Sequence, residues 1–156
     1  MSLEELKNID VSDFTAGRLI SMISKGQQIY LNHNLKRLGI NSSQLYLLFE
    51  ISHQSNINQE MIAKRCNFNK GAVARSIKKL EDNKMVVREI DETNRRQNKI
   101  SLTSKGKTVL NDSIEILDKW ESEVFKNCSD EYKLLNESLK KVFINTIELN
   151  MEANNE

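Results

Sequence analysis

Residues 58 to 103 carry a series of local signals that few folds can satisfy together. Asn58 is a good N-cap for a short helix that runs to about Cys66, and Asn69 is a good N-cap for a second helix that runs to about Leu80. Only two residues separate these helices, so they must meet in a tight turn. Two segments of strand composition, 85–90 and 99–102, follow and are joined by a polar loop, which predicts a β-hairpin.

The charge of the chain is concentrated around this segment. The net charge of the 156 residues is only +1, but residues 64–107 hold 13 Lys or Arg and 5 Asp or Glu, a balance of +8 against −7 for the remainder. Basic charge gathered around one motif is typical of nucleic-acid binding, whereas an isolated basic run is usually a solvated surface. A cationic helix followed by a cationic hairpin suits a major groove and the adjacent minor groove. The pattern is that of a winged helix-turn-helix, and double-stranded DNA is the expected partner.

The first two turns of the second helix are predicted to meet base edges, because that is the part of a helix-turn-helix that enters the groove. Gly71 and Ala72 have almost no side chain and allow close approach, and Arg75 is expected to read a guanine. The predicted base contacts are Lys70, Gly71, Ala72 and Arg75. The opposite face of this helix is expected to be buried through Val73, Ile77 and Leu80.

Other polar residues are expected to hold the DNA backbone. Amide groups at the start of a helix bind phosphate, and lysines on the flank of the second helix reach the phosphates beside the groove. The predicted phosphate contacts are Ser43, Gln44, Lys78, Lys79, Arg88 and Arg95, and the predicted minor-groove residue at the tip of the hairpin is Arg96.

Long helices are expected on both sides of this segment, since the chain has no proline and only five glycines. Apolar residues recur at helical spacing from about Ser12 to Leu38, Gly39 supplies a stop, and Ser42 is predicted to cap the next helix. Thr103 is predicted to cap a long helix, and Ser129 to open the last one. The expected organisation is a dimerisation helix in 1–40, the winged helix-turn-helix in 41–103 (helix-turn-helix about 58–81, wing about 85–102), dimerisation helices in 104–150 and a frayed tail in 151–156.

The outer helices carry more apolar surface than a core of this size needs. Trp120, Phe125, Phe143 and Ile147 could close a monomer core, or the terminal helices of two chains could interlock. The dimer is favoured, because a helix-turn-helix reads two half-sites about 34–36 Å apart through two-fold symmetry.

The chain resembles the MarR family of winged-helix transcription regulators over about residues 10–150. The resemblance is most specific in Asn94-Arg95-Arg96, in Leu102-Thr103-Ser104-Lys105-Gly106, and in 80–86, which matches the end of the family's recognition helix. It implies a homodimer, often a repressor, that binds a pseudo-palindromic operator and is released by a small ligand or an oxidant. It also implies a cleft for an anionic or aromatic effector, for which Tyr30, His33, Tyr46 and Phe49 are candidates, with core packing as the alternative.

Two positions depart from the family pattern. The family usually has Asp where this chain has Asn94, and that carboxylate holds the wing arginine in position. In this chain, the arginine would be held by a neutral hydrogen bond from Asn94, or by Asp91 or Glu92. The family prefers Gly where Lys84 stands, and Asn83 is expected to take the left-handed conformation instead.

Other classes of function find less support. His33 and His53 are the only histidines and lie in no acid–base or nucleophile pattern, so neither an enzyme nor a cofactor is expected. These histidines, even with Cys66, have no short-range spacing for a metal. A thiol redox switch at Cys66 or Cys128 and a winged helix that binds protein instead of DNA stay open as alternatives. No apolar run reaches the roughly 20 residues of a membrane span and no signal peptide is evident, so a cytoplasmic protein is expected.

Overall fold

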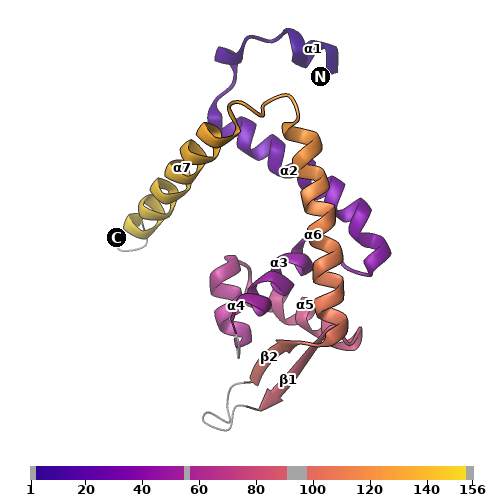
Figure 1. Cartoon of the computed structure of the whole chain (residues 1–156). Helices are drawn as coiled ribbons and strands as arrows, with labels where there is room; N and C mark the ends of the chain where they lie inside the picture. Colours follow the sequence, from indigo (N-terminus) through magenta and orange to yellow (C-terminus); the bar gives the residue numbers. More distant parts are fainter. Residues whose placement is uncertain (1–2, 55–56, 91–97, 154–156) are drawn as a thin grey trace. The chain divides into compact units, whose positions relative to one another are not determined.

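The computed structural model describes all residues except 1–2, 55–56, 91–97 and 154–156. Along the chain it has the helices and strands α1 (Leu3–Asn8), α2 (Ala16–Leu35), α3 (Ser42–His53), α4 (Gln59–Cys66), α5 (Lys70–Asp82), β1 (Val86–Ile90), β2 (Asn98–Leu102), α6 (Ser104–Phe125) and α7 (Tyr132–Ala153) (Figure 1). Short 3₁₀ turns at Val11–Asp13 and Lys36–Leu38 flank α2. The chain forms two compact units, Met1–Leu117 and Asp118–Glu156. The fold is mainly helical with one small wing, which confirms the predicted fold class.

The core of the first unit lies among α3, α4, α5 and the hairpin, and buried residues at the end of α2 and in α6 complete it. It is built from aliphatic side chains such as Leu45, Leu48 and Ile62, which are fully buried. Val73, Ile77 and Leu80 of α5 join them, so the predicted buried face of this helix is confirmed. With one face of α5 fixed in the core, its opposite face must point outward.

The wing is an antiparallel pair in which Val86 faces Leu102 and Arg88 faces Ile100. The segment before α4 extends this sheet, because the amide of Ile100 donates a hydrogen bond to the carbonyl of Ile57 at 2.9 Å. The hairpin is thereby tied to the start of α4 as well as to the end of α5. In Figure 1 it extends below α4 and α5.

Three predicted helix caps are present. The side chain of Asn58 accepts from the amide of Met61 at 2.8 Å, that of Asn69 from the amide of Gly71 at 2.9 Å, and that of Thr103 from the amide of Gly106 at 3.1 Å. Gly39 ends its helix in the left-handed conformation, at φ +75°. These signals depend on neighbours in the sequence, which is why they could be read from it.

The predicted cap at Ser42 is wrong by one residue. Asn41 caps α3 and forms a capping box with Gln44, with reciprocal hydrogen bonds of 2.9 and 3.0 Å. The amide of Ser42 instead donates to the side chain of Asn32 in α2 at 2.8 Å. A contact with another helix therefore decides which of two capable residues is the cap.

The left-handed residue after α5 is also not the predicted one. Asn83 has φ −82°, whereas Lys84 has φ 58°. The amide of Met85 must donate to the carbonyl of Leu80, at 2.9 Å, to start β1 on the core, and this places the reversal at Lys84. A glycine at this position would adopt the left-handed conformation without strain.

The second unit begins in the last turns of α6. Trp120 and Phe125 meet edge to face at 6.3 Å between ring centroids, and Phe125 and Tyr132 do so at 5.2 Å. The predicted start of the last helix at Ser129 is three residues early, since α7 begins at Tyr132, and it continues to Ala153. Phe143 is 65% and Ile147 44% exposed, so neither closes a core within the single chain. In the described part of the chain, no helix combines the length and the apolar character that a bilayer span requires.

Candidate nucleic-acid interface

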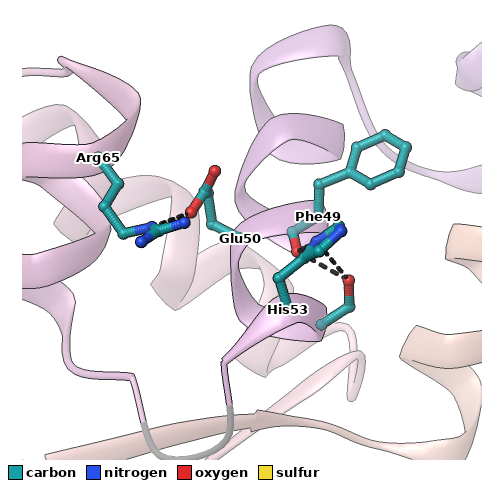
Figure 2. Close-up of polar contacts among 5 residues, drawn as sticks. Phe49, Glu50, His53 and Arg65 are labelled. Carbon is teal, nitrogen blue, oxygen red and sulfur yellow. Dashed lines mark hydrogen bonds and ion pairs between the residues drawn. The ribbon is translucent and has the colours of Figure 1, made fainter.

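The two helices of the helix-turn-helix are held by local geometry and by one ion pair. Asn67 ends α4 in the left-handed conformation, at φ 51°, and its amide donates back to the carbonyl of Lys64. Figure 2 shows Arg65 of α4 paired with Glu50 of α3, which fastens α4 to the helix behind it. The turn and the pair together fix the direction in which α5 leaves the core.

The N-terminus of α5 is exposed, and its first amides are already capped. Asn69 Oδ1 accepts from the amides of Gly71 and Ala72 at 2.9 and 3.3 Å. A Cβ at residue 71 would lie 3.2 Å from that same oxygen. Gly71 therefore serves the cap and also leaves the backbone uncovered on the outer face, where a groove floor can approach it.

The basic residues of α5 fall into two groups. Arg75 and Lys79 are exposed, and neither makes an ion pair within the part of the chain that the structure describes. Lys70 Nζ lies 2.5 Å from a carboxylate oxygen of Glu60, and Lys78 Nζ lies 2.7 Å from one of Asp82. The hydrogen bond to Asp82 raises the pKa of Lys78 above its ordinary value. Arg75 and Lys79 are thus the α5 cations that can meet DNA without first leaving a carboxylate.

Arg88 sits differently from the other predicted phosphate contacts. Its side chain is 27% exposed, and its Nε lies 3.3 Å from a Glu81 oxygen without forming a hydrogen bond. The contact joins β1 to the end of α5. The Nε atom that faces Glu81 is buried, so a phosphate contact by Arg88 would have to come from the outer nitrogens of its guanidinium.

The two predicted phosphate contacts of α3 also differ from each other. Gln44 is 5% exposed, and its side-chain oxygen and its amide are both engaged by Asn41. Ser43 is exposed at the same helix start. The geometry leaves Ser43 as the better placed of the two for a phosphate.

The predicted wing contacts Arg95 and Arg96, together with Asn94, lie outside the described residues. The strands that lead to them are described and pair in register from Val86–Leu102 to Ile90–Asn98.

The four candidate effector residues differ in their burial. Tyr30 and Phe49 are half-buried against the core, while His33 and Tyr46 are exposed. His53 Nδ1 lies 2.8 Å from the carbonyl oxygen of Phe49, one turn earlier in α3 (Figure 2). A cavity of about 560 Å³ lies elsewhere, between α3, β2 and α6, and is lined by Ile51, Ser52, Ser101, Leu102, Lys107, Leu110, Asn111 and Ile114.

The two cysteines differ in their surroundings. Burial, and then the charge of Glu50, raise the pKa of the Cys66 thiol, which disfavours the reactive thiolate. Cys128 is exposed. Within the described ranges, no three His, Cys, Asp or Glu side chains are placed to hold a metal ion together.

The sequence prediction missed the acids that accompany the basic residues. The Lys78–Asp82 pair has the i, i+4 spacing that a helix favours, so it could have been found. The Glu60–Lys70 pair joins two helices across a turn, and ten residues separate its members. No local rule indicates that pair.

Comparisons with known proteins agree with this architecture. A sequence profile described as the MarR family matches residues 38–97. An uncharacterized HTH-type transcriptional regulator of Bacillus subtilis (strain 168), YdgJ, is 32% identical over 97 residues, which are 62% of this chain and 59% of that relative. The aligned part therefore spans less than two thirds of the relative's length.

Solved structures extend the likeness to most of the fold. A crystal structure of MarR has a TM-score of 0.83 at 24% identity and covers 93% of this chain and 99% of its own. A cysteine-to-serine mutant of MarR from E. coli, complexed with operator DNA, has a TM-score of 0.73 at 26% identity and covers 86% and 99%. The matched segment 38–97 contains the helix-turn-helix and the first wing strand. A MarR transcriptional regulator from Methanosarcina mazei Go1 is 30% identical, has a TM-score of 0.67, and covers 81% of this chain and 96% of its own. By that relative, by the matched segment and by its fold, the chain belongs to the MarR family of transcription regulators, which are not enzymes.

Proposed function

We propose that this protein is a transcription regulator that binds double-stranded DNA sequence-specifically as a homodimer. The observation that carries the proposal is the outer face of α5, where Arg75 and Lys79 are exposed beside a capped helix start. That face has the shape and charge needed to enter a major groove. The E. coli MarR mutant of the same fold was solved with operator DNA, which supports the assignment by analogy.

The homodimer is supported by the apolar side chains of α7. Leu134, Phe143 and Leu149 are each about two-thirds exposed in the single chain. A soluble monomer seldom leaves so many large apolar groups of one helix in water. A second copy that covers this face would also present two α5 helices to two half-sites of a pseudo-palindromic operator.

Repression, with release by a small effector, is the mode of action that the family resemblance favours. An anionic or aromatic compound is the proposed effector class, at the cleft around Tyr30, His33, Tyr46 and Phe49. The cavity between α3, β2 and α6 is a second place for such a ligand, since half of its lining residues are aliphatic and Lys107 supplies a positive charge.

The test is fluorescence anisotropy with a duplex from the region upstream of the protein's own gene, titrated in salt with random competitor DNA. Arg75→Ala is expected to weaken operator binding by about 1–3 kcal/mol and to relax sequence preference, because a base contact is lost. Lys79→Ala should weaken all duplexes alike, because a phosphate contact carries no sequence information. Equal losses on operator and random DNA for Arg75→Ala would refute its role in base reading, and no binding at low salt would refute the proposed function.

A further inference from the structure

The Glu60–Lys70 ion pair lies where α5 is proposed to meet DNA. Glu60 is in the first turn of α4 and Lys70 is the first residue of α5, with 2.5 Å between the carboxylate oxygen and Nζ. The Lys78–Asp82 pair, by contrast, is internal to α5 and lies toward its C-terminal end. Glu60 therefore belongs to a different helix from Lys70, the cation that it binds. Lys70 itself lies in the turn of α5 that is proposed to read bases.

Both members of the pair line a cleft of about 310 Å³ between the start of α4 and the wing. Arg88 and Asn98 form other parts of its wall. An anionic oxygen that entered this cleft would meet the positive charges of Lys70 and Arg88 and the negative charge of Glu60. The hydrogen bond from Lys70, followed by its charge, lowers the pKa of Glu60, so the carboxylate is ionised at neutral pH.

We propose that Glu60 is an internal competitor of DNA, whose carboxylate occupies Lys70 in the free protein and thereby weakens binding to duplexes of any sequence. The inference rests on the proposed function. Both side chains are mostly exposed, at 75% for Lys70 and 67% for Glu60. A pair so exposed to solvent is weak enough to be exchanged when a phosphate arrives, yet its carboxylate still opposes that exchange.

The test is the variant Glu60→Gln, which keeps the size of the side chain and removes its charge. On random DNA, where no specific base contact forms, Lys70 can then pair with a phosphate without leaving a carboxylate, and no freed acid takes up a cation from solution in its place. The expected result is random-duplex binding tighter by about twofold to fivefold per protomer near 0.1 M salt, with a salt dependence steeper by about one unit per protomer. Anisotropy titrations of the full-length protein from about 0.05 to 0.3 M salt measure both quantities.

Two controls separate competition for Lys70 from a general change in charge. Glu115→Gln removes the same charge from an exposed position of α6 and is expected to leave affinity nearly unchanged. In a Lys70→Gln background, Glu60→Gln should bring no gain. A gain that persists there would show simple repulsion of DNA by Glu60 and would overturn the inference.

A second comparison tests the same idea without changing Glu60. Lys70→Gln should lose less random-DNA affinity than Lys79→Gln, because only Lys70 already has a partner to leave. An equal or larger loss for Lys70→Gln contradicts the inference, as does a Glu60→Gln protein that binds like Glu115→Gln. If the wild-type protein binds operator DNA in those cases, the proposed function stands and this inference alone fails. If it binds no duplex at low salt, both fail.

Discussion

Gly106 is the position where the structure makes its sharpest prediction. It lies in the first turn of α6, directly against the backbone of Met85 at the start of the wing. A Cβ added there would be 2.0 Å from the Met85 carbonyl oxygen and 3.0 Å from its carbonyl carbon. Because the obstructing atoms are backbone, Gly106→Ala must push α6 and the wing apart.

The loss in free energy of unfolding follows from the hydrogen bonds that this movement weakens. Contacts of a Cβ closer than 3.0 Å are essentially never seen, so the gap must open by about 1 Å. The same junction holds the Thr103 amide on the Met85 carbonyl at 3.0 Å and the Thr103 hydroxyl on the Lys84 carbonyl at 2.7 Å. Overpacking costs about 1–3 kcal/mol, and each weakened hydrogen bond costs about 1 kcal/mol. The higher helix propensity of alanine offsets about 1 kcal/mol of this. The net loss in free energy of unfolding should therefore be about 3 kcal/mol.

The assay is urea unfolding followed by circular dichroism at 222 nm, with all proteins at one concentration because unfolding of a dimer depends on it. Gly26→Ala is the matched control, since a Cβ at this position in the middle of α2 meets nothing within 4 Å. It is expected to stabilise by up to about 1 kcal/mol through helix propensity. A Gly106→Ala protein within about 0.5 kcal/mol of wild type would refute the reasoning.

Three further outcomes are expected. Lys84→Gly should raise the free energy of unfolding by about 0.5–1 kcal/mol by relieving the left-handed backbone at φ 58°, as measured by urea unfolding, whereas Lys84→Ala should bring no such gain. Phe143→Asp should convert the proposed dimer to monomers in sedimentation velocity, because it charges the exposed apolar face of α7. Asn145→Asp, two positions on, should leave that dimer intact, and equal behaviour of the two variants would contradict the proposed α7 interface. Cys66 should react with iodoacetamide at pH 7.5 more slowly than the exposed Cys128, because burial raises the pKa of the Cys66 thiol. Mass spectrometry of tryptic peptides measures both rates, and a faster reaction at Cys66 would favour a redox role for that thiol.

Local signals explain why much of the fold could be predicted. The caps at Asn58 and Asn69 depend on amides two or three residues away, and the burial of Val73, Ile77 and Leu80 depends on helical periodicity. The position of α5, its outward face and the hairpin after it follow from those signals. The basic side chains of the candidate interface were predicted with them, since they occupy the remaining positions of the same helix.

The errors arose where two residues could play one role. Asn41 and Ser42 are both able to cap α3, and a hydrogen bond from Ser42 to Asn32 of another helix selects Asn41. Asn83 and Lys84 could both end α5, and the entry of Met85 into β1 selects Lys84, although asparagine tolerates that conformation better. Propensity ranks such neighbours, but a particular hydrogen bond chooses between them, to another helix at Ser42 and to the last turn of α5 at Met85.

The sequence by itself determined the order of the elements, the family and which face of α5 is free, because these rest on capping, periodicity and residue type within a few positions. Only the tertiary structure decided which basic side chains near that face are paired with a carboxylate and which are not. Glu60 meets Lys70 across the turn and Glu81 lies beside Arg88, while Arg75 and Lys79 meet no carboxylate in the described part of the chain. Electrostatic interaction depends on distance in space, and the turn after Asn67 and the register of the wing set that distance.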